Sequence, residues 1–335
     1  MDPPETGSAM FVPTTFHAAL FMTALSTVCW GSFANTFKLT RNYRFELYYW
    51  DYGLGIFLIS LLLAFTMGSY AGGPTAFLAN LHAADPINLF YAALGGFIFN
   101  IANTLLVAGI EIVGLAIAFP VSIGIALVEG VVLSYALQPR GNPALLTMGI
   151  LMALVALVLV GKAYGALRTA GSAVSRRGVV VCVISGLLMG IFAPFVTRAM
   201  TRGATLTPYT TAVFLTLGAF VCCFFFNTIL MRKPITGTPV AAAEYFRAPA
   251  SYHALGLLGG AIWGCGTVFN FVAASLVGVA ISYAIGQASP MVACLWGVFA
   301  WKEFRGANIN AKVYLASMFA AYLLALVLIA RAYAG

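Results

Sequence analysis

The chain has 335 residues, of which 62% are hydrophobic and only 8% are charged. Soluble domains carry roughly 25% charged residues, so this composition excludes an ordinary soluble enzyme or binding domain and predicts an integral membrane protein. The net charge of +8 fits a role in membrane orientation, and we expect a lipid bilayer and no nucleic acid as the partner.

Apolar blocks of about 20 residues recur along the chain, the length that crosses a hydrocarbon core of ~30 Å as a helix. Strands of a membrane barrel would instead alternate polar and apolar residues over ~10 positions. We therefore expect an all-α, polytopic fold with ten transmembrane helices. In chain order, the predicted spans are 16–37, 47–69, 87–109, 113–137, 144–165, 178–199, 207–230, 254–275, 278–301 and 312–332.

The segments outside the spans define the expected domain organisation. Residues 1–15 form a predicted N-terminal tail with no Lys or Arg ahead of the first apolar run, which argues against a removed signal peptide. Residues 166–177 form a basic cytoplasmic linker. It joins a first five-helix repeat, 16–165, to a second, 178–335.

The basic residues are distributed unevenly between the two ends of the predicted helices. Thirteen of the 17 Lys and Arg residues lie near the connections between spans 1 and 2, 5 and 6, 7 and 8, and 9 and 10. They are Lys38, Arg41, Arg44, Lys162, Arg168, Arg176, Arg177, Arg232, Lys233, Arg247, Lys302, Arg305 and Lys312. The positive-inside rule assigns these connections to the cytoplasm and both termini to the other side.

The two halves of the chain repeat each other at an offset of 164 residues. The sequence GGFIFNIANT from Gly95 returns as GGAIWGCGTV from Gly259, and VGLA from Val113 returns as VGVA from Val277. Each half holds five spans, an odd number, so the second copy must enter the membrane from the opposite side. Inverted repeats are a recurring basis of alternating access around a site near the bilayer midplane. The sequence thus predicts a transporter.

Three short motifs resemble those of a known superfamily. AFPVSIG at 118–124 is similar to a fourth-helix motif of bacterial glucose/ribose uptake proteins, with Phe119 where those proteins have methionine. Tyr-Trp-Asp-Tyr at 49–52 resembles the start of the second helix of ureide permeases, and LWGVFAWKEFRG at 295–306 shares a pattern with rhamnose–proton symporters. The chain is identified as resembling the drug/metabolite transporter superfamily.

This resemblance implies secondary active import of a small polar solute, sugar-like or ureide-like, coupled to protons and working by alternating access. It also implies a bacterial inner (plasma) membrane. Two alternatives remain open at this point: a proton-antiporting exporter of metabolites or drugs, and a non-transporting membrane scaffold or receptor. The oligomeric state does not follow from the sequence.

Two acidic residues are candidates for proton coupling. Glu129 lies well inside span 4, about 24 Å along the helix, where an ionised side chain costs ~2.5 kcal/mol or more. A hydrogen-bonded structural role is its alternative. Asp51 lies near the start of span 2 beside Tyr48, Tyr49, Trp50 and Tyr52. Such an aromatic group is also typical of an interfacial belt, so an interface position is the alternative for Asp51.

Polar and aromatic side chains within the spans are the candidate solute ligands. Amide and hydroxyl groups can hydrogen-bond a polar solute, and indole rings offer flat surfaces for a ring. Each of them can equally serve as a hydrogen-bonding or packing residue between helices. The candidates are Trp30, Asn35, Asn100, Asn103, Ser122, Trp263, Asn270, Ser282, Tyr283 and Gln287. Pro120, Pro194 and Pro290 are expected to loosen spans 4, 6 and 9.

Signals for an enzyme or a metal site do not occur in the sequence. His17, His82 and His253 are too scattered for a metal set, and the six cysteines contain no CxxC pair. No P-loop, HExxH or GxSxG motif occurs either. We therefore expect no catalytic residues, no metal and no cofactor.

Overall fold

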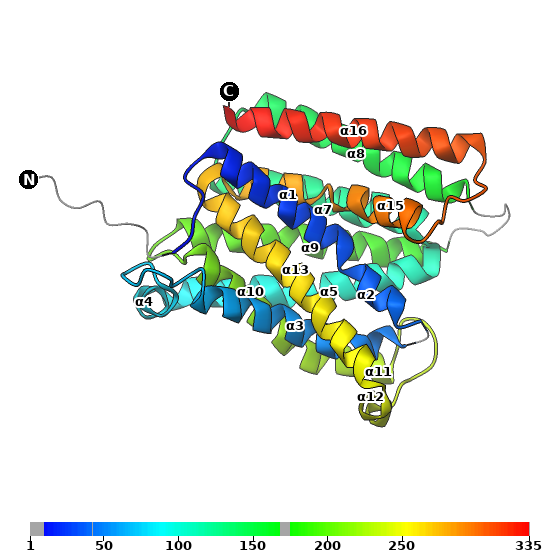
Figure 1. Cartoon of the computed structure of the whole chain (residues 1–335), viewed down its shortest axis with the longest axis horizontal. Helices are drawn as coiled ribbons and strands as arrows, with labels where there is room; N and C mark the ends of the chain where they lie inside the picture. The colour runs from blue at the N-terminus through cyan, green and yellow to red at the C-terminus, as the bar shows by residue number, and fades with distance from the viewer. Residues whose placement is uncertain (1–9, 42, 168–174, 335) are drawn as a thin grey trace, which may run out of the picture.

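A computed structural model of the chain describes residues 10–41, 43–167 and 175–334, and within them every regular element is a helix. The long helices run roughly along one direction and form a single bundle (Figure 1). The predicted tail 1–15 and linker 166–177 lie partly outside the described residues.

Ten spans in the described part of the chain are long and apolar enough to cross a membrane, and the chain is an integral membrane protein. Each predicted span is present, with its ends shifted by a few residues. The spans are α1 (Phe16–Ser32) with α2 (Ala34–Leu39), α3 (Phe45–Phe65), α5 (Pro86–Val113), α6 (Leu115–Ala118) with η1 (Phe119–Ile123) and α7 (Gly124–Leu137), α8 (Pro143–Gly165), α9 (Arg176–Thr201), α10 (Pro208–Cys222) with η2 (Cys223–Asn227) and α11 (Thr228–Arg232), α13 (Ala250–Val277), α14 (Val279–Gly286) with α15 (Ser289–Phe299), and α16 (Ile309–Ala334). Short helices α4 (Phe77–Ala83) and α12 (Ala242–Arg247) lie in connections.

Three spans begin with the same local signal, a capping side chain followed by proline. Asp85 Oδ1 accepts from the Ile87 N–H at 3.0 Å, and Asn142 Oδ1 accepts from the Ala144 N–H at 2.9 Å. Thr207 caps α10 in the same way. Proline suits the first helical position because its missing N–H would be unpaired there, and the cap satisfies another of the free N–H groups. The sequence itself therefore sets these helix starts.

Helices α5 and α13 share a length and an ending. Both have 28 residues, and both stop at a glycine with positive φ, 78° at Gly114 and 89° at Gly278. Their ψ values of 165° and 151° complete a backbone conformation that is essentially confined to glycine. The glycines allow the next span to start at once, which explains why both turns are so short.

Two of the three expected proline effects are present. Pro120 lies in the π-helical turn η1, and Pro290 is in the first turn of α15, after the break between α14 and α15. Helix α9, in contrast, continues through Pro194 without interruption. The missing N–H of Pro194 still leaves the Gly190 carbonyl without its usual helical partner, but no break in α9 accompanies it.

Glycines allow the backbones of neighbouring spans to cross closely. A Cβ added to Gly96 of α5 would lie 1.7 Å from the carbonyl oxygen of Leu215 in α10, and one on Gly260 of α13 would lie 2.1 Å from that of Tyr52 in α3. Helix α8 packs along α16 at one edge of the bundle (Figure 1). A central cavity is lined by residues of α1, α2, α3, α5, η1, α9, α13 and α15 and of the connections at their ends, and by Tyr164 of α8.

Candidate functional site

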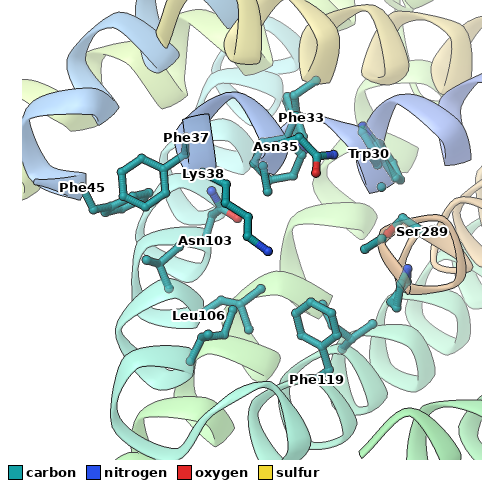
Figure 2. Close-up of a pocket in the computed structure, with 18 of the residues that line it drawn as sticks. Trp30, Phe33, Asn35, Phe37, Lys38, Phe45, Asn103, Leu106, Phe119 and Ser289 are labelled. Carbon is teal, nitrogen blue, oxygen red and sulfur yellow. The ribbon is translucent and has the colours of Figure 1, made fainter. Parts of the chain in front are cut away.

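A cavity of about 530 Å³ lies between the spans. Figure 2 labels ten of the lining residues, Lys38 among them. The lining also includes Arg41, Glu111 and Glu303, and these four charged residues lie where α2, α5 and α15 end or just beyond. We call this the basic end of the bundle, because α8 and α11 end there too and their connections carry most of the Lys and Arg residues. A volume of this size is in the range of small-molecule sites.

Aromatic rings lie at the inner limit of the cavity. Trp263 stacks on Phe99, with ring centroids 4.6 Å apart, and on Trp30 at 6.0 Å. Trp30 Nε1 donates to the Thr267 hydroxyl at 3.2 Å. A Cβ on Gly286 would lie only 2.5 Å from the Trp30 ring, so the glycine makes the space in which the indole sits. We call these three stacked rings the floor of the cavity, because they lie near the middle of α5, α13 and the span that contains α1.

Three carboxamides face the cavity. Asn35 is held on both sides, because its Oδ1 accepts from Trp301 Nε1 at 2.6 Å and its Nδ2 donates to the Ser32 carbonyl at 2.8 Å. Asn103 Nδ2 donates to the Tyr49 hydroxyl at 3.1 Å. Gln287 also belongs to the lining, and its side chain makes no hydrogen bond to another described residue.

Charged groups of both signs line the mouth at the basic end. Lys38 forms an ion pair with Glu303, and its ammonium lies 4.4 Å from the centre of the Trp301 ring. The Tyr164 hydroxyl donates to the same carboxylate at 3.0 Å. These contacts join α2 and α8 to the connection after α15 on one side of the mouth.

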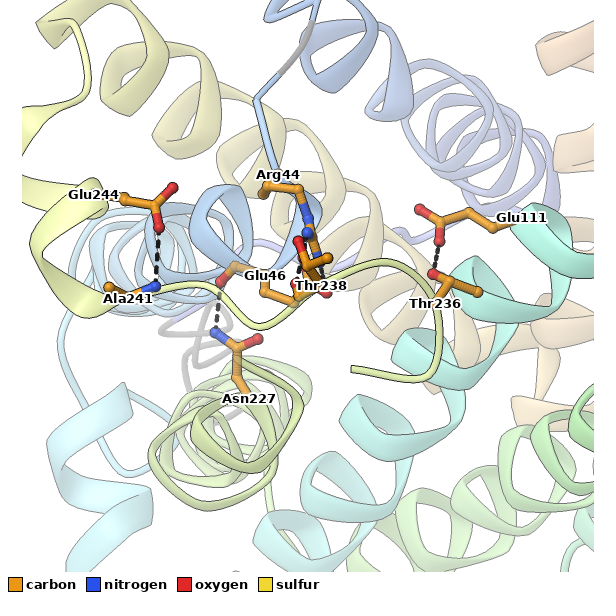
Figure 3. A network of polar contacts seen from close by, with 8 residues as sticks. All are labelled: Arg44, Glu46, Glu111, Asn227, Thr236, Thr238, Ala241 and Glu244. Carbon is orange, nitrogen blue, oxygen red and sulfur yellow. Dashed lines mark hydrogen bonds and ion pairs between the residues drawn. The ribbon is translucent and has the colours of Figure 1, made fainter. Parts of the chain in front are cut away.

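The connection between α11 and α13 is tied to the other side of the mouth (Figure 3). Arg44 binds both carboxylate oxygens of Glu46, at 2.8 and 3.1 Å, and donates to the Thr238 carbonyl at 2.8 Å. The hydrogen bond to Glu46 raises the pKa of the Arg44 guanidinium above its usual value. Thr236 donates to Glu111, a residue of the mouth. The connection is thus fastened to α3 and α5.

Five of the ten predicted solute ligands lie at the cavity and five do not. Those in the lining are Trp30, Asn35, Asn103, Trp263 and Gln287. The others bond neighbouring helices: Ser282 donates to the Asn270 carbonyl at 2.7 Å, and Asn270 returns a bond to the Ser282 carbonyl at 2.9 Å. Ser122 donates to the Cys182 carbonyl at 2.9 Å.

The two remaining candidates also face other helices. The Tyr283 hydroxyl lies 3.2 Å from the Met189 carbonyl and 3.3 Å from that of Ala126, and Asn100 Oδ1 accepts from the Cys223 thiol at 3.8 Å. In this conformation the contacts of Tyr283 and Asn100 support the alternative role, in which each side chain links neighbouring spans.

Neither predicted coupling residue lines the cavity. Glu129 lies against Gly190 of α9, and its Oε2 has no hydrogen-bond partner among the described residues. Asp51 is buried and accepts from the Tyr245 hydroxyl at 2.6 Å, with His253 Nδ1 at 2.8 Å. Burial, together with this bond to Asp51, raises the pKa of Tyr245. The hydroxyl therefore stays protonated and donates the hydrogen bond to the carboxylate.

The aromatic run around Asp51 does not form an interfacial belt. Tyr48, Tyr49 and Tyr52 are each at most 1% exposed, and all three line the cavity. Positions 49 and 52 share a helix face, and that face points into the bundle. The i, i+3 spacing of Tyr49 and Tyr52 on either side of Asp51 is the sequence signal for a shared inward face. The aromatic composition of the same stretch favours an interfacial position instead. Within the described chain no group of three His, Cys, Asp or Glu residues is placed to hold a metal.

Comparisons with known proteins agree on one family. The family described as Ureide permease matches residues 164–332. Ureide permease 1 of Arabidopsis thaliana is 22% identical over 339 residues, covering 83% of this chain and 86% of that protein. Ureide permease 5 of the same plant is 24% identical over 149 residues, covering 42% of this chain and 36% of the relative.

A solved structure has the same fold. The crystal structure of a protein that is 16% identical superposes with a TM-score of 0.64, covering 94% of this chain and 98% of the other. At that identity the similarity concerns the fold alone.

Proposed function

Because the chain belongs to the ureide permease family, a branch of the drug/metabolite transporter superfamily, we propose that it is a secondary active transporter that imports a small polar solute of the ureide type. The observation that carries the proposal is the cavity between the spans, whose lining runs from charged residues at the basic end to the stack of Phe99, Trp263 and Trp30. A site reached from one end and closed at the other is what alternating access requires of each state.

The lining favours a flat ring with amide groups over a sugar. Trp30 and Trp263 offer ring faces, and Asn103 and Gln287 offer carboxamides that can pair with N–H and C=O groups. Aromatic faces with a few placed polar groups are typical of sites for such molecules. A cyclic ureide presents both features, whereas a sugar presents hydroxyls around its whole edge.

The proposed mechanism uses two inverted five-helix repeats, 16–165 and 178–335. Its support is the equal length of α5 and α13 and their matching ends at Gly114 and Gly278, at the same offset of 164 as the sequence repeat. By the positive-inside rule the basic end is cytoplasmic, so both termini lie outside and the cavity faces inward in this conformation. The proposed location is a bacterial plasma membrane.

Protons are the proposed coupling ion, and Glu129 is the proposed carrier. Replacing Glu129 by glutamine keeps the size and removes the ionisable group. We expect Glu129→Gln to lose pH-gradient-driven accumulation at least tenfold while exchange of labelled for unlabelled solute continues, because only net transport needs a proton to be released. Uptake that keeps the wild-type pH dependence would contradict this assignment. Asp51→Asn is the matching test of the second candidate.

Uptake into proteoliposomes tests the proposed function. The purified full-length chain is reconstituted and offered radiolabelled allantoin, uracil, xanthine and glucose, with and without an inwardly directed proton gradient. We expect accumulation of at least one of the three amide-bearing rings, increased by the gradient. Accumulation of glucose alone would overturn the ureide class, and proton-driven extrusion of the solutes would support the exporter instead. If no solute moves in either direction, the remaining hypothesis is a non-transporting scaffold or receptor.

A further inference from the structure

Two membrane spans are interrupted at corresponding positions of the proposed repeats. Span 9 breaks between α14 and α15, at Gln287 and Ala288, and span 4 contains the π-helical turn η1, which ends at Ile123. Positions 123 and 287 are 164 residues apart, which is the offset of the sequence repeat. In transporters built from repeats, interruptions at matching places in the two halves point to the binding site. Both positions belong to the lining of the cavity.

The two positions differ in their chemistry. Ile123 is apolar, whereas Gln287 carries a carboxamide with an NH₂ donor and an acceptor oxygen. Gln287 is only 7% exposed, and its side chain makes no hydrogen bond to another described residue. Neither of its polar atoms is among the fully enclosed, unpaired atoms of the described chain, so both keep accessible surface in a side chain that lines the cavity. A buried amide without a partner in the protein is a group that a bound solute can satisfy.

The backbone around Gln287 is held in one conformation. Its N–H donates to the Tyr283 carbonyl at 3.0 Å, and the Ala288 N–H donates to the Ile285 carbonyl at 3.0 Å. The Thr27 hydroxyl of α1 donates to the same Ile285 carbonyl at 3.2 Å. The carboxamide therefore extends from a fixed point at the break.

An aromatic ring lies directly against this break. A Cβ added to Gly286 would lie 2.5 Å from the Trp30 ring, and one added to Gly31 would lie 2.6 Å from the Ser289 carbonyl oxygen. Helix α1 thus contacts the chain just before and just after Gln287, and Figure 2 shows Trp30 and Ser289 at the cavity. The lining therefore places an indole next to the residue that carries the unpaired carboxamide.

We propose that Gln287 recognises the amide edge of the solute. Its NH₂ group donates to a ring carbonyl, and its oxygen accepts from the ring N–H beside that carbonyl, so one carboxamide makes two hydrogen bonds. The ligand class is a planar ring that carries C=O and N–H side by side, as cyclic ureides and pyrimidinediones do. Ile123, at the matching position of the first half, offers no such pair. This inference rests on the proposed function and assigns its specificity to one residue of span 9.

The competing explanation is that Gln287 only fills space at the break. Gln287→Leu keeps a side chain of similar volume, removes both polar atoms and breaks no hydrogen bond within the described chain. Gln138 provides the matched control, because it is the only other glutamine of the sequence, its side chain likewise makes no hydrogen bond to a described residue, and it lies outside the cavity lining. The same substitution there, Gln138→Leu, is expected to behave as the wild type.

The experiment measures equilibrium binding of radiolabelled uracil to the purified full-length chain in detergent, so that a variant need not complete a transport cycle. Thymine and 1,3-dimethyluracil are the competitors, because thymine adds a methyl group and keeps every N–H, whereas 1,3-dimethyluracil has no N–H. In the wild type we expect thymine to compete within about threefold of uracil, since the cavity of about 530 Å³ has room for a methyl group. We expect 1,3-dimethyluracil to compete about tenfold more weakly than uracil.

The variant separates recognition from packing. We expect Gln287→Leu to bind uracil about tenfold more weakly than the wild type, and uracil and 1,3-dimethyluracil to compete within about threefold of each other, because the partner of the N–H is gone. The midpoint of thermal unfolding should stay within about 2 °C of the wild type. Binding too weak to detect, at an unchanged midpoint, supports the assignment as well.

The outcomes also separate this inference from the proposed function. A Gln287→Leu variant that binds uracil as tightly as the wild type, or still rejects 1,3-dimethyluracil about tenfold, would overturn the assignment of Gln287 alone. An equal loss of affinity in Gln138→Leu, or a midpoint lowered by about 5 °C or more in Gln287→Leu, would show a structural effect and overturn it too. Binding of allantoin without binding of uracil would overturn the ligand class named here. No binding of uracil, allantoin or xanthine by the wild type would overturn the proposed function and this inference with it.

Discussion

Replacing Gly96 by alanine is expected to lower the thermal stability of the bundle more than the same change at Gly95 or Gly109, the other glycines of α5. The new Cβ would lie 1.7 Å from the carbonyl oxygen of Leu215 and 2.6 Å from its carbonyl carbon. Both are backbone atoms of α10 and cannot rotate away. The crossing is tight from both sides, because a Cβ on Gly218 of α10 would lie 1.9 Å from the carbonyl oxygen of Ala93.

The two helices would have to separate, which opens the interface along their length. Overpacking of a core costs ~1–3 kcal/mol when side chains can adjust and more when backbone must move. We expect the midpoint of thermal unfolding in detergent to fall by about 5 °C or more. Gly95→Ala is the control one position away, since its Cβ would meet the Phe195 Cβ at 3.3 Å and no backbone atom closer than 3.5 Å. Equal midpoints for the two variants would contradict the packing described.

Replacing Trp263 by alanine is expected to abolish solute accumulation. The indole is stacked between Phe99 and Trp30 and is 5% exposed, so its loss removes the centre of the cavity floor. A Trp→Ala change in a core also costs about 3–5 kcal/mol of stability. If the cavity opens to both sides of the membrane at once, solute leaks back through it. Net accumulation should therefore fall at least tenfold even where the protein reaches the membrane.

Trp263→Phe shows whether lost accumulation comes from the missing ring in the floor or from a general loss of packing. Phenylalanine keeps a ring between the two neighbours and should restore most of the accumulation that alanine loses. Uptake is compared with thermal stability for both variants. Accumulation near the wild-type level in Trp263→Ala, at equal amounts of protein in the liposomes, would show that the stack does not close the transport path.

The spans could be predicted from the sequence because their cause is local. A run of about 20 apolar residues must be helical to satisfy its backbone in a bilayer, whatever it packs against. The Asp85-Pro86 and Asn142-Pro143 starts, and the short turns at Gly114 and Gly278, are local in the same sense. Pro194 shows the limit, because a helix can continue through a proline when its neighbours allow it.

The site could be predicted only in part, because it depends on which helix each face meets. Asn100 and Asn103 share a face by spacing, but only Asn103 reaches the cavity, while Asn100 meets Cys223 of a neighbouring span. The sequence does not predict Tyr52 as a cavity residue, because aromatic residues near a span end are common at interfaces. Lys38 and Glu303 lie far apart in sequence, and their pairing follows from tertiary structure alone.

Access to the cavity from the two sides of the membrane decides whether the protein works by alternating access. Ala34 lines the cavity and is exposed in it, so Ala34→Cys, in a chain whose six native cysteines are replaced, reports access to a membrane-impermeant thiol reagent. We expect modification from the side of the basic end without solute, protection by uracil, and modification from the opposite side once solute and a proton gradient are applied there. Modification from one side only under every condition would contradict alternating access through this cavity.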